Sequence, residues 1–272
     1  MIRALFAIAA LASNVLACPD HSPSKAALRK RLLAGDGTNA DDWTWDNTGA
    51  WPAISAICGN GTMQSPIDLD PGNFSQVMVP TFNYAMDTVC GSLTNSGYGP
   101  AFTLTAMEQD DIDEHPSFTA DGVSYYLLGW HTHTPSEHTF GGQAVEAELH
   151  LVHGDKDGNA IGVVGFPLTV GDESSFLAQF MGSTTMPSKE TETPVAVSDI
   201  NMGLILKDAG DFQTYWSYAG SLTTPPCSEG KRWWVSGQTV TISPAQWEDL
   251  QAVSAPSARE VQKIGRHRLN QD

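Results

Sequence analysis

The sequence predicts a mainly β protein with a single folded domain. From Trp43 onward, short apolar or alternating runs are separated by turn-forming clusters, which is the pattern of β-strands joined by tight loops. Patterns typical of helices are few and short. The 272 residues contain no internal repeat, and they are enough to bury the core of one large all-β domain.

The predicted strands are the runs richest in β-branched, aliphatic and aromatic residues. In chain order they are Ser124–Trp130, Glu146–His153, Ile161–Val170 and Trp233–Ile242. Residues 155–159, Asp-Lys-Asp-Gly-Asn, predict a hairpin turn between the second and third, because Asp, Gly and Asn favour tight turns. The short helix candidates are Ser174–Met181, Asp208–Tyr215 and Pro244–Val253.

The first residues predict export from the cell. Residues 1–17 combine a basic start at Arg3, an apolar run and a small-residue cleavage pattern, as a secretory signal peptide does. Residues 18–40 are rich in polar residues and predict a poorly ordered extension, so the folded domain is assigned to 41–272. No later segment is long and apolar enough to span a membrane, and we expect a secreted protein.

Charge and glycosylation signals agree with secretion. The net charge of −17 argues against a nucleic-acid partner, because a polyanion would be repelled, and favours a soluble extracellular protein. The sequons that begin at Asn60 and Asn73 predict glycosylation if the source is eukaryotic. Cys18 follows the cleavage point as in a bacterial lipidation site, but the sequons favour plain secretion.

A group of histidines is the strongest chemical signal. His131 and His133 are two positions apart in an apolar run, so they lie on one face of a strand, and His150 comes on the next predicted strand. Three neutral imidazoles without a neighbouring cysteine fit a catalytic zinc site, which keeps one coordination position open. Glu137 and Glu148 in the same stretch are candidate acceptors for the ligand ring N–H groups.

The two other histidines of this stretch have a structural interpretation. His153 is an odd number of positions from His150, so its side chain points to the opposite face of the strand. Buried polar groups are most often simply hydrogen-bonded, and we expect this of both His138 and His153.

Three further motifs supply a family resemblance. They are Met63–Asp68 with its QSPI run, the YW-x-Y run Tyr215–Tyr218, and the SLTTPP-C run Gly220–Cys227. With the histidine pattern, the chain from about Trp43 to Gln262 resembles α-class carbonic anhydrases of the secreted, fungal or other microbial type. The resemblance implies a large, twisted, mostly antiparallel central sheet with a few short helices.

The resemblance also implies the reaction and the roles of single residues. The reaction is the reversible hydration of carbon dioxide to bicarbonate and a proton by zinc-bound hydroxide, the work of a zinc hydro-lyase. The three histidines of the cluster would bind Zn²⁺, and Glu148 would orient His150. Thr223 would accept a hydrogen bond from the hydroxide and donate its own proton to Glu137. The apolar wall against which carbon dioxide rests would consist of Val152, Val163, Leu222 and Trp233, and Thr224, also a substrate-binding candidate, would lie beside Thr223 in the cleft.

Four cysteines in an exported protein indicate disulfides. The resemblance pairs Cys58 with Cys227, which would tie the N-terminal segment to the loop that carries Thr223. Cys18 and Cys90 are left over. They either pair with each other, or one of them bridges two chains in a homodimer.

The sequence departs from the family pattern in three places. Gly129 stands where a glutamine usually orients the first ligand. Ser257 begins a segment that replaces the usual N-x-RP-x-Q, but the contact to the ligand there uses a backbone carbonyl, which serine also has. Tyr98 stands where the proton-shuttle histidine is expected, although a two-residue insertion blurs the alignment, and His115 is the alternative shuttle.

Two other functional classes remain open. A binding module without catalysis is the first, but such domains typically lack a zinc ligand, and this chain keeps all three. A zinc hydrolase acting on esters is the second, since it would use the same nucleophile.

Overall fold

The computed structural model describes residues 43–76, 79–84, 88–95, 97–104, 112–181, 186–187 and 194–271. The predicted signal peptide and extension lie outside these residues, and so does Cys18.

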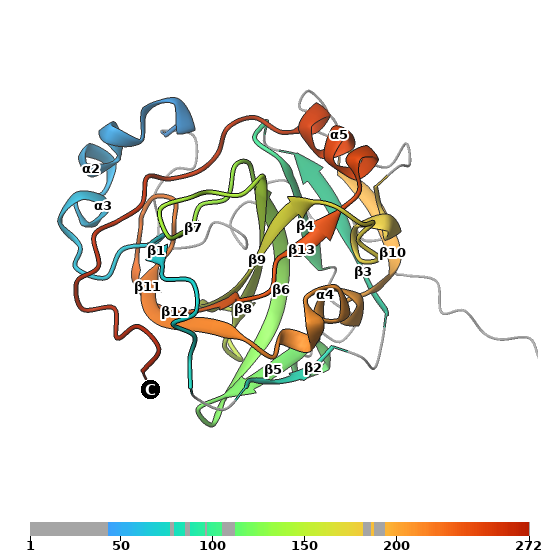
Figure 1. Ribbon diagram of the computed structural model, residues 1–272, viewed down its shortest axis with the longest axis horizontal. Helices are drawn as coiled ribbons and strands as arrows, with labels where there is room; N and C mark the ends of the chain where they lie inside the picture. The colour runs from blue at the N-terminus through green and yellow to red at the C-terminus, as the bar shows by residue number, and fades with distance from the viewer. Residues whose placement is uncertain are drawn as a thin grey trace, which may run out of the picture.

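A single large sheet dominates the structure, as predicted (Figure 1). Within the described ranges it has 11 strands, and its main path runs β10-β3-β4-β6-β8-β9-β12-β11. The bounds on this path are β10 (Val195–Asn201), β3 (Thr88–Asn95), β4 (Pro100–Leu104), β6 (Val123–His133), β8 (Ala147–Gly154), β9 (Ala160–Val170), β12 (Glu229–Ser236) and β11 (Tyr215–Ser221). All of these pairs are antiparallel except β9 with β12.

Shorter strands complete the β structure. A further strand, β13 (Val240–Ile242), lies parallel to β9, and β5 (Ser117–Ala120) pairs antiparallel with both β6 and β2 (Thr81–Asn83). The parallel strands β1 (Asp68–Leu69) and β7 (Thr139–Phe140) form a separate two-stranded sheet.

The first three predicted strands are confirmed, and so is the hairpin turn. In that turn the Asp155 carboxylate accepts hydrogen bonds from the backbone amides of Asp157 and Asn159, both at 2.9 Å. The fourth predicted strand, Trp233–Ile242, is two strands in the structure. The first, β12, ends at Ser236, and the second, β13, begins at Val240. Ser236 and Gln238 bond to each other across the turn between them, which breaks the run.

Of the three helix predictions, only Pro244–Val253 is confirmed, as α5. Its N-terminus carries a capping box in which Ser243 and Gln246 satisfy each other's backbone amides. Ser174–Met181 holds only the 3₁₀ turn η3 (Leu177–Gln179).

The prediction of a helix over Asp208–Tyr215 was wrong. The helix there is α4 (Gly203–Asp208), which ends where that prediction begins. Gly210, Asp211 and Phe212 follow with positive φ, which stops a right-handed helix and leaves only the turn η4 (Gly210–Phe212).

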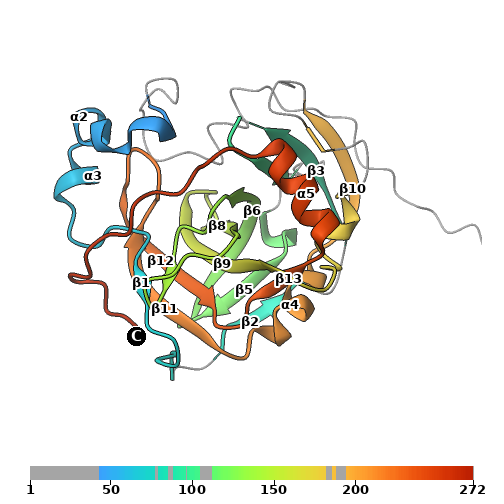
Figure 2. The same ribbon diagram turned by 45° about the horizontal axis from the view of Figure 1, so that its top comes forward.

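Short helices η1 (Trp45–Ala50), α2 (Trp51–Ile54) and α3 (Ile57–Asn60) precede the sheet, and η2 (Ile112–Glu114) precedes β5. After α5, the C-terminal segment runs back towards α2 and α3 (Figures 1 and 2). Backbone bonds fix it there: Gln262 donates to the Pro66 carbonyl at 2.8 Å and Arg266 to that of Thr62 at 3.1 Å.

The register of the sheet separates its two faces. One row across the strands is wholly apolar and buried in the main core, and it consists of Leu93, Phe102, Trp130, Leu151, Val164 and Trp234. Because side chains alternate between faces, the adjacent row lies on the opposite face. It consists of Ser92, Thr103, Gly129, Val152, Val163 and Trp233. The histidine cluster lies on this second face: His131 and His150 are paired in its next row, and His133 lies in the row after that, opposite Glu148.

Candidate metal centre and active site

The structure brings the three predicted ligands together at the centre of the sheet. His131 and His133 lie on β6, and His150 lies on β8 directly opposite His131. One ring nitrogen from each histidine lies within 4.8 Å of the others. His133 and His150 are buried, and His131 is half-buried.

A hydrogen bond of His133 and a carboxylate contact of His150 indicate which ring nitrogen of each is free. The Nδ1–H of His133 donates to the carbonyl of Ser257 at 2.6 Å, so its lone pair is on Nε2, which is buried and has no hydrogen-bond partner. Nε2 of His150 lies 3.0 Å from Oε1 of Glu148, which leaves Nδ1 as the ligand atom. These tautomers are the ones that a metal ion requires.

Burial also keeps the three imidazoles neutral. It lowers the pKa of His131 well below its ordinary value, lowers that of His133 to about 4, and lowers that of His150. Unprotonated imidazoles without a nearby cysteine are a donor set that suits zinc. The residues present therefore fit the ion that the sequence predicted.

Glu148 is a buried carboxylate that contacts the rings of His138 and His150. Although burial opposes its ionisation, the neighbouring His138 and His150 hold its pKa well below the ordinary value. One carboxylate oxygen contacts both of these rings, and the other accepts the backbone amides of Glu137 and His138. A second possible metal-binding group, His138 with Glu148 and His150, is therefore already a hydrogen-bonded network.

His138 and His153 have the structural contacts that were predicted for them. His138 contacts Glu148 through Nδ1 at 2.7 Å and the Tyr218 hydroxyl through Nε2 at 2.7 Å. His153 lies in the core, where its ring bonds to the Leu151 carbonyl and the Tyr84 hydroxyl.

Glu137 is a buried carboxyl beside the metal-binding atoms. Its Oε2 lies 3.4 Å from Nε2 of His133 and 3.8 Å from Nδ1 of His150, and its Oε1 accepts the backbone amide of Arg259 at 2.9 Å. Burial raises its pKa to about 7, against the opposing effects of His150, the Arg259 amide and the Thr223 hydroxyl. Thr223 is 7% exposed, in the turn between β11 and β12.

Apolar residues of the predicted substrate wall lie next to the cluster. Val152, Val163 and Trp233 occupy consecutive strands on the histidine face of the sheet and are nearly fully buried. The Trp233 ring centroid is 4.9 Å from that of His150. Leu222 and Thr224 flank Thr223 and are half-buried, so they remain accessible from outside.

The two candidates for the proton shuttle, Tyr98 and His115, lie in different parts of the structure. Tyr98 is half-buried in the turn between β3 and β4, and its ring contacts Trp45, whose ring in turn contacts His133. His115 donates to the carbonyl of Leu127, which lies four positions before His131 on β6, or roughly 13 Å along a strand. Of the two, Tyr98 has the contacts that lead to the cluster.

Arg259 is a functional residue that the sequence interpretation did not single out. It is 4% exposed, and its guanidinium donates to the carbonyls of Ser65 and Cys58 and to the Gln64 side chain while its amide holds Glu137. Only its place in the segment of Ser257 could have pointed to it, since a lone arginine in a sequence carries no such signal.

The Cys58–Cys227 disulfide is present, with an S–S distance of 2.12 Å across a sequence separation of 169. Its surroundings include Trp51, with Trp43, Trp45, Ile54 and Ile57 packed around it. Cys90 is also disulfide-bonded.

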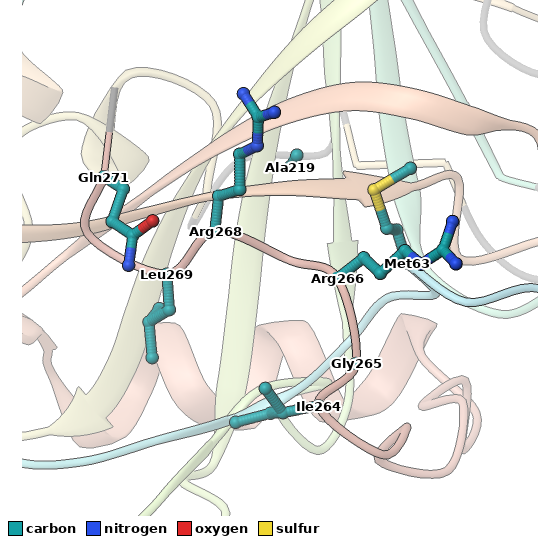
Figure 3. A pocket seen from close by; sticks show the side chains of 8 residues that line it. All are labelled: Met63, Ala219, Ile264, Gly265, Arg266, Arg268, Leu269 and Gln271. Atoms are coloured by element: carbon teal, nitrogen blue, oxygen red, sulfur yellow. The ribbon is translucent and has the colours of Figure 1, made fainter.

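A hollow elsewhere on the surface does not belong to this site. Its volume is about 720 Å³, and the C-terminal segment supplies most of its lining (Figure 3). The lining residues are Met63, Ala219, Ile264, Gly265, Arg266, Arg268, Leu269 and Gln271, and they include none of the predicted site residues. Among the described residues, no helix is long and apolar enough to cross a membrane.

Acid should destabilise the metal-free protein through its buried histidines. Burial lowers the pKa of His153 to about 3 and that of His133 to about 4, against 6.5 for an ordinary imidazole. The unfolded chain therefore binds more protons in this window, and the free energy of unfolding should fall as the pH drops from 6.5 towards 3. Each such histidine contributes up to ~1.4 kcal/mol per pH unit.

Glu137 acts in the opposite direction, because its raised pKa means that protonation between about pH 7 and 4.5 favours the folded state. Thermal unfolding at a series of pH values measures the sum of the histidine and Glu137 effects. His153→Gln should make the dependence of stability on pH shallower. Stability that is unchanged on acidification would contradict the expectation.

Comparisons with known proteins agree with this geometry. The profile of the eukaryotic-type carbonic anhydrase family matches residues 46–271. A carbonic anhydrase from Klebsiella pneumoniae is 32% identical over 231 residues, which are 83% of this chain and 88% of that protein.

Two solved structures are similar in fold. The α-carbonic anhydrase from Thermovibrio ammonificans, in complex with the inhibitor sulfanilamide, is 29% identical with a TM-score of 0.71, over 86% of this chain and 99% of that one. A dioscorin complexed with ascorbate is 25% identical with a TM-score of 0.68, over 86% and 97% of the two chains. By its sequence profile, its fold and its histidine cluster, this chain belongs to the eukaryotic-type carbonic anhydrase family, whose zinc-dependent reaction is the hydration of carbon dioxide.

Proposed function

We propose that His131, His133 and His150 bind one zinc ion and that carbon dioxide is hydrated beside it. The observation that carries the proposal is the buried Nε2 of His133, which has no hydrogen-bond partner while its Nδ1 is engaged. A zinc ion bound by three imidazoles supplies a hydroxide nucleophile near neutral pH, for which carbonic anhydrase is the standard example. The remaining steps belong to the side chains around it.

Thr223 and Glu137 orient the nucleophile. The Arg259 amide and the surrounding core fix the Glu137 carboxyl, with Oε2 towards the ligand histidines. The Thr223 hydroxyl has a single proton, and donating it to Glu137 leaves only acceptor lone pairs facing the cleft. A nucleophile that donates its own proton to Thr223 is held with its lone pair directed at the substrate.

The apolar wall receives the substrate. Carbon dioxide is small and has no net charge or dipole, so Val152, Val163, Leu222 and Trp233 can hold it without competing for it through hydrogen bonds. Burial of Val152, Val163 and Trp233 also keeps ordered water away from the reacting carbon. Thr224 lies at the accessible edge of this wall.

The alternative functions have less support. The dioscorin similarity gives a binding module of this fold a concrete example, since that protein was crystallised with ascorbate. A complete histidine cluster with Thr223 and Glu137 beside it favours catalysis over binding alone. Ester hydrolysis could use the same nucleophile, but nothing in the sequence resembles a dedicated ester pocket.

We also propose that the chain is secreted after loss of residues 1–17, with 18–40 as an extension of the domain 41–272. The Cys58–Cys227 disulfide supports an oxidising destination. Asn60 and Asn73 are both exposed, as glycan acceptors must be. Cys90 is already disulfide-bonded and no described cysteine is free, so the structure gives no support to a homodimer bridged by a leftover cysteine; non-reducing electrophoresis of the secreted protein checks this alternative.

Removal of the metal tests the proposed function directly. We expect one zinc per chain and fast carbon dioxide hydration, a loss of activity on treatment with a chelator that parallels zinc loss, and recovery when zinc is returned. Zinc content by elemental analysis and stopped-flow hydration with a pH indicator supply the two measurements. Full activity in zinc-free protein would exclude the proposal, and bound zinc without hydration would favour the binding module.

Proton export should limit turnover, because Tyr98 stands where a shuttle histidine is expected. An imidazole with a pKa of about 6.5 takes up and releases a proton near pH 7, whereas a phenol is a poor acceptor there. We expect the maximal rate to rise with the concentration of imidazole buffer. Tyr98→His should raise the rate in weak buffer by roughly tenfold, which is less than the roughly 10²–10⁴-fold that general acid–base catalysis typically contributes.

The matched control is His115→Ala, which removes the alternative shuttle and should leave the buffer dependence unchanged. A wild-type rate that is high and independent of buffer would show that another group exports the proton.

A further inference from the structure

The three histidines of the cluster are not held equally. His133 is fixed by the Ser257 carbonyl and His150 by Glu148, but His131 has only ring contacts among the described residues. Position 129, two residues earlier on the same face of β6, is a glycine and offers no side chain. The ring of His131 therefore lacks a direct hydrogen-bonded partner.

Thr103, a neighbour of His131 on the adjacent strand, has a hydroxyl that also lacks a hydrogen-bond partner among the described residues. It lies on β4 directly opposite Gly129, on the face that also carries His131, because its neighbours Phe102 and Leu104 belong to the core on the other face. Its side chain is 2% exposed, and its hydroxyl is buried without a hydrogen-bond partner. An unsatisfied buried hydroxyl costs free energy unless something bonds to it.

Other neighbours of His131 cannot supply the missing bond. The residue directly opposite on β4 is Ala101, which has no polar atom in its side chain. On the other flank is His150, itself one of the proposed ligands, and Val152 follows on the same face. Among the described strand neighbours on this face that are not proposed ligands, Thr103 is the one whose polar group has no partner.

We propose that Thr103 positions His131 for metal binding through one bridging water. Diagonal neighbours on antiparallel strands are about 7–8 Å apart, a separation that suits a bridge through one water. Among the described residues the Thr103 hydroxyl makes no direct hydrogen bond to the His131 ring. The Thr103 hydroxyl and the non-ligating ring nitrogen of His131 provide two polar partners for it. This inference rests on the proposed zinc site and adds a positioning residue to it.

The expected consequence is a change in metal retention. Partners that orient a ligand histidine typically change metal affinity by roughly 10–100-fold. Thr103→Val keeps the shape of the side chain and removes the hydroxyl, so zinc should dissociate about tenfold faster or more, near the lower end of that range. Thr103→Ser keeps the hydroxyl and should release zinc at the wild-type rate.

The experiment measures zinc release into excess chelator for wild type, Thr103→Val, Thr103→Ser and Thr103→Ala. The serine and alanine variants differ only in Oγ, so this pair carries the test if valine disturbs the packing. Ser92→Ala is the matched control, since it removes a buried hydroxyl from the same face one strand further from His131, and it should behave as wild type.

A second readout uses the zinc-free protein. In ¹⁵N-edited spectra of its histidine side chains, His131 should populate one tautomer in wild type and Thr103→Ser, and a mixture in Thr103→Val and Thr103→Ala.

Wild-type zinc release in both variants that lack the hydroxyl would overturn the proposal. Equal acceleration in Thr103→Ser or in Ser92→Ala would also overturn it, because the effect would not belong to the Thr103 hydroxyl. A wild-type chain that binds no zinc would instead defeat the proposed function, and the tautomer measurement would still decide whether Thr103 controls His131.

Discussion

Replacing His131 by alanine should abolish both tight zinc retention and carbon dioxide hydration. Two imidazoles leave a zinc ion without the third nitrogen that the closely spaced cluster provides. The loss of affinity should exceed the roughly 10–100-fold that removal of an outer partner causes, because a ligand itself is lost. Hydration should fall to near the uncatalysed rate, since the nucleophile depends on the metal. Elemental analysis after dialysis and stopped-flow hydration measure the two effects.

His138→Gln is an informative control for this variant. His138 is a buried histidine of the same region whose two ring nitrogens are engaged by Glu148 and Tyr218. The His138→Gln substitution should weaken zinc binding only as much as the loss of a residue that supports a ligand does, and it should leave measurable activity. Full zinc occupancy in the His131→Ala protein would show that the cluster is not the metal site.

Removal of the Cys58–Cys227 disulfide should be the largest single loss of stability. The bond closes a loop with a sequence separation of 169, and the chain-entropy estimate for so long a loop is about 4–5 kcal/mol. The double variant Cys58→Ser with Cys227→Ser is preferable to a reducing agent, because Cys90 is also disulfide-bonded. Chemical denaturation of the two proteins measures the difference.

Activity should fall together with stability in this variant. The carbonyl of Cys58 accepts a hydrogen bond from Arg259, and the amide of Cys227 donates to the Thr224 carbonyl. Loss of the bond therefore loosens both the arginine that holds Glu137 and the turn that carries Thr223. A loss below about 1 kcal/mol, far short of the chain-entropy value, would contradict the expectation. A non-reduced digest that finds Cys58 linked elsewhere would contradict the pairing itself.

The sequence predicted the parts of the site that depend on local spacing. The two-residue spacing of His131 and His133 places both on one strand face, and the structure has them there. Strands with a clear apolar pattern were predicted close to their bounds. The helix over Asp208–Tyr215 was wrong because positive φ angles at three consecutive residues are decided by tertiary context, which a pattern of apolar residues does not contain.

Other features could not be predicted because they depend on pairing between distant segments. Thr103 lies diagonal to His131 on the same face of the sheet only because β4 pairs with β6 in one register. A shift of that register by one residue would turn the Thr103 side chain into the core. Arg259 reaches Glu137 from 122 positions further along the chain. Neither relation leaves a trace in the spacing of nearby residues.

The C-terminal segment after α5 has a consequence for biosynthesis. The sheet that carries the three histidines is complete in sequence by Ile242, yet the carbonyl that fixes His133 and the arginine that fixes Glu137 arrive only with Ser257 and Arg259. On the ribosome, the chain therefore passes through a stage in which all metal-binding side chains have emerged but two of the groups that orient them have not. Completion of the site then waits for the synthesis of this segment, and a premature stop ahead of Ser257 removes both of these groups while leaving the three histidines in place.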